Sequence, residues 1–148
     1  MNLEHWQAAF ANAWGIEAAF TRLDGEYDLN FLATGADGAG YVVKAMRPGC
    51  EAWLVDMQIA ALDHIRANAP DVPVPAVIRS ASGAAIKPIS DENGDIRLVW
   101  VLERLPGRCY APANPKTPDL IHQVGMALGA SAKALQDFTH DGLARDFK

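Results

Sequence analysis

The sequence predicts an α+β fold: a five-stranded antiparallel sheet with an N-terminal helix, a helix between the third and fourth strands, and a C-terminal helix. Two observations predict this class. Apolar residues recur at helical spacing in three stretches, and short apolar runs bounded by glycine, asparagine and aspartate occupy the intervals between them. The length of 148 residues suits one domain with a sizeable core.

The first fifteen residues predict an amphipathic helix. Leu3, Trp6, Phe10 and Trp14 recur at helical spacing, Asn2 is a suitable N-cap, and the helix should end near residue 15, a glycine. Its apolar stripe must pack against another element.

Residues 16–43 predict a three-stranded antiparallel meander. Apolar runs at 18–20, 29–32 and 41–43 are separated by the polar turn at 24–28 and by a glycine-rich turn at 35–40. The pattern therefore changes from helical spacing to strand-and-turn spacing.

The middle of the chain predicts one helix and two further strands. Apolar residues at 53–65 share one helical face, and the helix should stop before Pro70. Residues 73–75 form an extended connector. Strands at 84–89 and 96–102 are joined by the turn-forming segment 91–95, which brings the sheet to five strands.

The last part of the chain predicts a linker and a helix. Pro106 and Gly107 end the last strand, and a proline-rich stretch follows. Thr117 is a suitable N-cap with Pro118 at the first helical position. We therefore expect a lobe over 1–107, a linker over 108–117, and a second structural unit that begins over 118–148.

Composition excludes several classes of function. The formal net charge of −5 argues against a nucleic-acid surface, which needs clustered lysine and arginine. The two cysteines, Cys50 and Cys109, have no disulfide-framework or zinc spacing, and a reducing cytoplasm is the simplest location. We expect no membrane span and no secretion signal.

Four segments in order resemble the N-terminal lobe of the aminoglycoside phosphotransferase, choline kinase and hydroxylysine kinase superfamily. The likeness is greatest to hydroxylysine kinase-like domains, some of which are fused to class III aminotransferases. The four segments are Leu23–Phe31, Tyr41–Lys44, Val72–Pro75 and Arg97–Gly107. The resemblance implies a kinase-like fold in which these segments hold a nucleotide.

Lys44 has the clearest chemical role within this resemblance. An ammonium fixed at a strand end can neutralise the α- and β-phosphates, although a lysine that only solvates the strand end is the plain alternative. The resemblance places Gln58, fourteen positions later, where related kinases have a glutamate that orients the lysine. An amide would position Lys44 without pairing its charge, and a solvent-facing Gln58 is the alternative.

The resemblance assigns two further nucleotide contacts. The turn that contains Gly25, Glu26, Tyr27 and Asp28 would be the nucleotide loop, where only the glycine lets the backbone approach closely and the carboxylates would have to point away from phosphate. An acidic turn without ligand is the alternative. The hinge would pair adenine with the carbonyl of Glu103 and the N–H of Leu105, unless this segment is simply a strand exit.

The second half of a phosphotransferase site does not occur in this sequence. The superfamily carries a His-x-Asp catalytic loop followed by an asparagine, then an aspartate motif that holds Mg²⁺, whereas His140–Gly142 has a different register. We therefore expect no catalytic residue and no metal ligand here. The chain would be a fragment, inactive alone, with its acceptor substrate bound by the missing lobe.

The resemblance implies ATP or GTP with Mg²⁺ in the full-length protein, and an amino-acid or amino-alcohol hydroxyl as acceptor. Pyridoxal phosphate would serve a downstream domain in fused relatives. Self-association through the exposed lobe interface is a further expectation. The alternative is a non-catalytic α+β binding or interaction domain at the N-terminus of a multidomain aminotransferase-type enzyme, in which the Lys44 site is vestigial.

Overall fold

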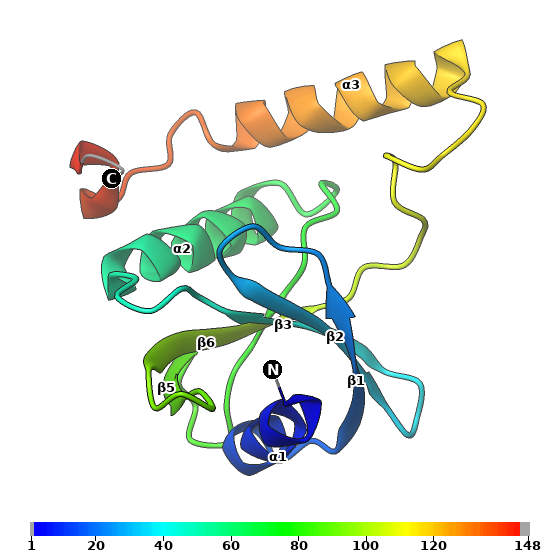
Figure 1. Cartoon of the computed structure of the whole chain (residues 1–148). Coiled ribbons are helices and arrows are strands. Elements are labelled where there is room, and N and C mark those ends of the chain that lie inside the picture. Colours follow the sequence, from blue (N-terminus) through cyan, green and yellow to red (C-terminus); the bar gives the residue numbers. More distant parts are fainter. Residues whose placement is uncertain (1, 146–148) are drawn as a thin grey trace. The chain divides into compact units, whose positions relative to one another are not determined.

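The computed structural model describes residues 2–145 and confirms the α+β class (Figure 1). In chain order its elements are α1 (Leu3–Trp14), β1 (Ala18–Leu23), β2 (Leu29–Gly35), β3 (Gly40–Ala45), α2 (Ala52–Asn68), β4 (Val77–Ile78), β5 (Ile86–Ser90), β6 (Ile96–Glu103), α3 (Pro118–Ala134) and a short 3₁₀ helix, η1 (Asp141–Ala144). The segment predicted over 118–148 runs past the described residues at 146–148.

The sheet has six strands within the described residues, so the prediction of five was wrong. The additional strand is β4, whose Val77 and Ile78 pair with Leu102 and Val101 of β6. A strand of two residues directly after the proline-rich connector is too short to show the alternation by which strands are recognised in a sequence.

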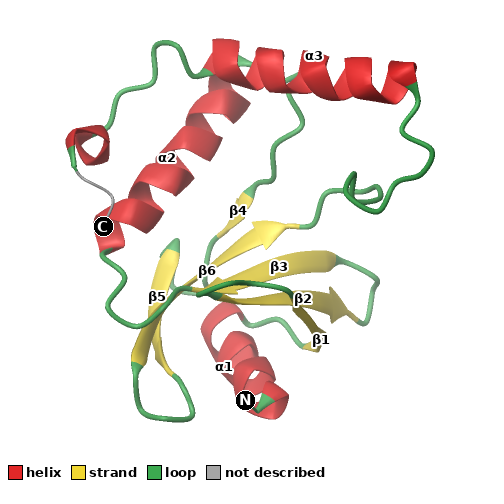
Figure 2. Ribbon diagram, turned by 45° about the horizontal axis from the view of Figure 1, so that its top comes forward, coloured by secondary structure: helices red, strands yellow, loops and turns green. Residues whose placement is uncertain are grey.

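Strand β6 pairs with three other strands of the sheet. The order β1-β2-β3-β6 is antiparallel throughout, and β6 pairs with β3 on one side and with both β4 and β5 on the other (Figure 2). Ile78 of β4 lies opposite Val101, and Ile86 of β5 lies opposite Trp100, the residue before Val101 in β6. β4 and β5 therefore form one sheet edge, interrupted by the excursion 79–85.

α1 packs its apolar stripe on one face of this sheet, which we call the helix face. Trp6, Phe10 and Trp14 are buried, and the ring centroids of Phe10 and Phe20 lie 5.5 Å apart at a steep angle. The strands contribute alternate residues to the same cluster: Phe20, Phe31, Ala33, Val43, Ala45, Val99 and Val101. This alternation is the two-residue period of strands with one buried face.

Both ends of α1 are fixed as the sequence predicts. The Asn2 side chain accepts hydrogen bonds from the backbone N–H groups of Glu4 and His5, and Gly15 ends the helix with a φ of 70°. Trp14 Nε1 donates to the Ile78 carbonyl at 3.0 Å, and the Ala81 N–H donates to the Ala13 carbonyl at 3.0 Å. The end of α1 is thus attached to the excursion that interrupts the sheet edge.

A buried ion pair organises the turn between β5 and β6. Asp91 is 7% exposed, and its carboxylate accepts hydrogen bonds from the backbone N–H groups of Asn93 and Asp95. Arg97 Nε donates to the same carboxylate at 2.8 Å, and Arg97 also donates to the Met46 carbonyl. The Arg97 hydrogen bond is the largest of the interactions that hold the pKa of Asp91 below its ordinary value.

The chain separates into two compact units. Unit 1 comprises Met1–Asp56 and Pro75–Arg104, and unit 2 comprises Met57–Val74 and Leu105–Lys148. Unit 1 contains the whole sheet and α1, and α2 begins in unit 1 and continues in unit 2. The lobe and linker boundaries expected from the sequence stay predictions. No helix within residues 2–145 combines the length and hydropathy needed to cross a membrane.

Unit 2 has its own internal contacts. His64 on α2 lies 3.1 Å from the Asp137 carboxylate, and its ring packs edge-on against Phe138 at 5.4 Å. The segment that follows α3 is therefore attached to the second half of α2.

Replacement of a fully buried aromatic should destabilise unit 1 strongly. Phe31 is 0% exposed between α1 and the neighbouring strands, so Phe31→Ala should lower the free energy of unfolding by about 3–5 kcal/mol, as measured by urea unfolding. Ile96→Ala, at a position that is 57% exposed in the same sheet, is the matched control and should cost less than about 1 kcal/mol. Equal losses in the two variants would contradict this core.

The Asp91–Arg97 pair should make stability depend on acid pH. The folded state lowers the pKa of Asp91 from its ordinary value of 3.8. The ionised carboxylate therefore adds to the free energy of unfolding above that value, and this added stability is lost as pH falls through the folded-state pKa. Asp91→Asn should be less stable than the wild type near neutral pH, and the gap should shrink in acid. Urea unfolding across this range measures it. Asp95→Asn is the control, and a constant gap for Asp91→Asn would contradict the prediction.

Candidate functional site

The register of the sheet decides which side chains share the face opposite α1, which we call the lysine face. Residues directly opposite in antiparallel strands point to the same side, and neighbours along a strand alternate. Val43 is buried on the helix face, so Lys44 belongs to the other face. Asn30 of β2 and Trp100 of β6 lie directly opposite Lys44 on its two sides.

Lys44 has neutral partners on the lysine face. Its Nζ lies 3.4 Å from Asn30 Oδ1, a long hydrogen bond, and 5.9 Å from the centroid of the Trp100 ring. Trp100 is 2% exposed, and its indole N–H contacts the sulfur of Met46. Lys44 takes part in no ion pair within residues 2–145. A half-buried ammonium without a paired carboxylate is suited to bind an anion.

An apolar row lies beside Lys44 on the same face. Leu32, Val42, Leu102 and Val77 occupy one register across four strands, two residues along from Asn30, Lys44 and Trp100. All four are half-buried. No function was predicted for this row, although Val42 lies two residues before Lys44 and therefore on the same face of a strand, which was the signal that could have found it. A flat aromatic ligand could lie on such a row.

The turn 24–28 lies beside Lys44 through Asn30. A Cβ on Gly25 would lie 2.5 Å from the Asp28 carbonyl oxygen and 2.6 Å from Asn30 Nδ2, so only glycine fits this position. Asn30 Nδ2 donates to the Asp24 carbonyl at 3.5 Å. The Asn30 amide therefore contacts the turn backbone through Nδ2 and the Lys44 ammonium through Oδ1.

The predicted residues of this turn divide into two groups. Asp28 points back to the chain, where its carboxylate accepts a hydrogen bond from the Arg47 N–H at 2.8 Å. Glu26 and Tyr27 are exposed, the latter by 69%. The charge of Asp28 is therefore engaged with the backbone that follows β3.

The predicted hinge begins at the end of β6. The Glu103 N–H donates to the Ala76 carbonyl at 2.8 Å, and its carboxylate accepts from the Ala76 N–H at 3.3 Å. The Arg104 N–H donates to the Gly40 carbonyl at 3.0 Å. Leu105, which is 39% exposed, is the first residue of the second segment of unit 2. The adenine contacts of Glu103 and Leu105 stay a prediction.

Gln58 belongs to the part of α2 that lies in unit 2, and its side chain is half-buried. Its role as the partner that orients Lys44 therefore stays a prediction. Within unit 1 the hydrogen-bond partner of Lys44 is Asn30, for which no role was predicted from the sequence.

Other chemistry has little support in the described residues. Within 2–145 no group of histidine, cysteine, aspartate and glutamate side chains is placed to hold a metal ion. Burial raises the pKa of the Cys50 thiol, against the opposing effect of Arg47, and the thiol is therefore unsuited to act as a nucleophile near neutral pH.

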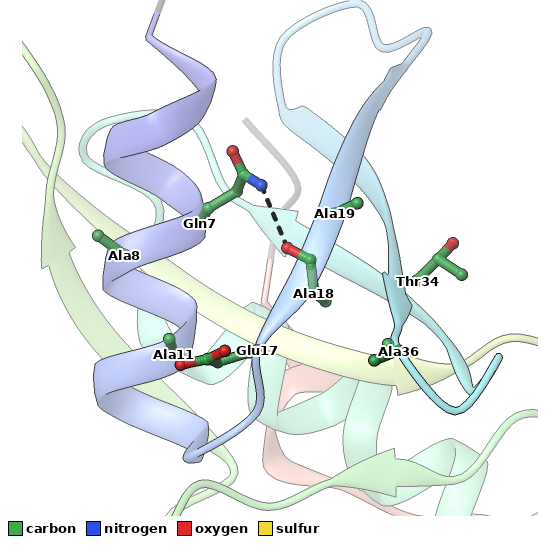
Figure 3. Close-up of a pocket in the computed structure, with 9 residues that line it drawn as sticks. Gln7, Ala8, Ala11, Glu17, Ala18, Ala19, Thr34 and Ala36 are labelled. Atoms are coloured by element: carbon green, nitrogen blue, oxygen red, sulfur yellow. Dashed lines mark hydrogen bonds between the residues drawn. The ribbon is translucent and has the colours of Figure 1, made fainter.

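A hollow of about 690 Å³ lies between α1 and the β1–β2 end of the sheet (Figure 3). Its lining consists mainly of small residues such as Ala8, Ala11 and Ala19, and Gln7 donates across it to the Ala18 carbonyl at 3.2 Å. It contains no lysine or arginine among its lining residues, so it does not suit a phosphate.

Two solved small-molecule kinases match the structure. Amicoumacin kinase hAmiN, in complex with AMP-PNP, Ca²⁺ and Ami, superposes with a TM-score of 0.72 at 19% identity, over 95% of this chain and 42% of its own. A microcompartment-associated aminopropanol kinase superposes with a TM-score of 0.74 at 18% identity, over 99% of this chain and 44% of its own. The chain has a kinase-like fold.

The kinase-like fold was predicted from the sequence, and the partial coverage is consistent with an N-terminal lobe. The chain spans less than half the length of either kinase. No protein-family model and no curated protein matches it.

Gly25→Ala should disturb the turn 24–28. The added Cβ would meet the Asp28 carbonyl, so we expect a loss of about 1–3 kcal/mol in the free energy of unfolding and shifted amide NMR signals across the turn. The matched control is Gly125→Ala in α3, where a Cβ meets no atom within 4 Å and should be neutral or stabilising by up to about 1 kcal/mol. An unchanged turn in Gly25→Ala would contradict the tight closure.

Proposed function

We propose that this chain is the nucleotide-binding N-terminal lobe of a small-molecule phosphotransferase, and that a larger lobe completes the reaction. The observation that carries the proposal is Lys44: a half-buried ammonium at the end of a central strand, with Asn30 and Trp100 as neutral neighbours and an apolar row beside it. The kinase-like fold supports the same assignment.

The phosphates of ATP or GTP would bind at Lys44. Its ammonium would form charge-assisted hydrogen bonds with the α- and β-phosphates, which are shorter and stronger than its 3.4 Å contact with Asn30. The backbone of the turn at Gly25 would lie over the phosphates. The Asp28 carboxylate would repel them less than a free carboxylate, because it accepts a hydrogen bond from the Arg47 N–H. The role that the resemblance implies for Gln58 is to orient Lys44 through a neutral amide.

The purine would lie on the apolar row of Leu32, Val42, Leu102 and Val77. This row adjoins the end of β6, where the carbonyl of Glu103 and the N–H of Leu105 would pair with the edge of the base. Burial of the base on an apolar surface supplies affinity, and the two backbone groups supply orientation. Apart from Lys44 and Gln58, recognition would rely mostly on backbone and apolar groups.

The remaining chemistry would come from the larger lobe. The described residues have no side-chain cluster suited to Mg²⁺, so they do not fit the metal that phosphoryl transfer requires. In α3, Ile121, Met126 and Leu128 are 53%, 63% and 66% exposed, and the helix has no buried residue. Exposed apolar side chains on one helix support the proposal that further protein packs against them.

The acceptor proposed from the resemblance is the hydroxyl of an amino acid or amino alcohol. The name of the aminopropanol kinase describes an amino alcohol, and the share of that kinase spanned by this chain is 44%. The acceptor pocket would belong to the larger lobe. A fused aminotransferase with pyridoxal phosphate, a cytoplasmic location and self-association stay predictions from the sequence.

Titration with MgATP, followed by ¹H–¹⁵N NMR of this chain, tests the proposal. We expect signals of the turn 24–28, of β3 and of residues 103–105 to shift at millimolar nucleotide, and Lys44→Ala to abolish the shifts. Lys87→Ala removes a lysine from the same sheet and is the matched control; it should leave the response unchanged. Absence of any wild-type response would favour the alternative of a non-catalytic interaction domain.

A further inference from the structure

Asn30 lies at the point where the turn 24–28 and Lys44 meet. It is the second residue of β2, opposite Lys44 in the register of β2 and β3, and half-buried on the lysine face. Its amide has one acceptor and two donors, so it can connect a cation on one side to a carbonyl on the other.

Both functions of the amide are used. Oδ1 accepts from Lys44 Nζ at 3.4 Å, and Nδ2 donates to the Asp24 carbonyl at 3.5 Å. Nδ2 lies close to Gly25, where an added Cβ would approach it to 2.6 Å, so the amide occupies space that glycine leaves open. The amide therefore links the position of the Lys44 ammonium to the position of the turn backbone.

Both contacts are long, and neither partner of Asn30 is a carboxylate. A phosphate oxygen can therefore replace Oδ1 as the partner of Lys44 without separating an ion pair. A carboxylate in the same place would hold the ammonium by its charge and would repel the incoming phosphates.

We propose that Asn30 is a positioning residue, which holds the Lys44 ammonium and the backbone of the turn 24–28 in register for the phosphates of a nucleotide. The proposal rests on the function proposed above, and names a residue of the same site that acts through Lys44. Neutrality of the amide is part of the role, because it leaves the charge of Lys44 available to the ligand.

Two variants of Asn30 separate positioning from simple folding. Asn30→Ala removes both contacts, and should weaken MgATP binding about fivefold, the size expected for one net hydrogen bond. Asn30→Asp keeps the size and the acceptor oxygen but adds charge, and should weaken binding by at least about tenfold. Both should shift the side-chain ammonium signal of Lys44 and the amide signals of the turn in the free protein.

The order of the two variants decides the question. A residue needed only for folding predicts that the loss of MgATP binding follows the loss of stability in the two variants, whereas positioning of a free charge predicts that Asp weakens binding more than Ala even after stability is taken into account. Thr34→Ala, on the same strand and the same face, is the control and should bind like the wild type. Urea unfolding of each variant excludes loss of fold as the cause.

The outcomes for Asn30 and for the proposed function can be distinguished. If the wild type binds MgATP and both Asn30 variants bind equally well, the role of Asn30 is wrong and the proposed function stands. If the wild type shows no response to MgATP, the proposed function is overturned, and with it the phosphate role of Asn30. Unchanged signals of Lys44 and the turn in free Asn30→Ala would also overturn the inference.

Discussion

Burial of the three aromatic side chains of α1 against one face of the sheet determines what every strand presents on the other face. Because strand residues alternate, fixing Phe31, Val43 and Val101 in the core places their neighbours Asn30, Lys44 and Trp100 together on the opposite side. A slip of one residue in β3 would bury Lys44 and expose Val43. The apolar packing of α1 therefore fixes the geometry of a polar site that it does not touch.

The helices and most of the strands could be predicted from the sequence because each has a local cause. Asn2, Gly15 and Thr117 cap helices through their own hydrogen bonds or backbone angles, and the observed ends agree with the predicted ones. β4 escaped prediction because it exists only through its pairing with β6, whose partner residues lie more than twenty positions away. A strand of only two residues is too short to show the alternation that made β3 and β6 recognisable.

The candidate site was predictable in part. Lys44 and Gly25 were singled out because they lie in segments that resemble those of a known superfamily. Asn30 and the row that contains Val42 were not recognised, because their importance comes from the register between strands. An asparagine next to apolar residues is, in a sequence, indistinguishable from a residue of an exposed strand end.

The turn that contains Asp28 changes how the charge of this molecule should be understood. Counted from the sequence, this region is acidic and would repel an anion. The Asp28 carboxylate is instead bound to the backbone at Arg47, as the Asp91 carboxylate is bound to its own turn and to Arg97. Near Lys44, the hydrogen bond from the Arg47 N–H therefore reduces the negative potential of the Asp28 carboxylate. An anionic ligand would therefore experience a weaker repulsive field at this face than the formal charge implies.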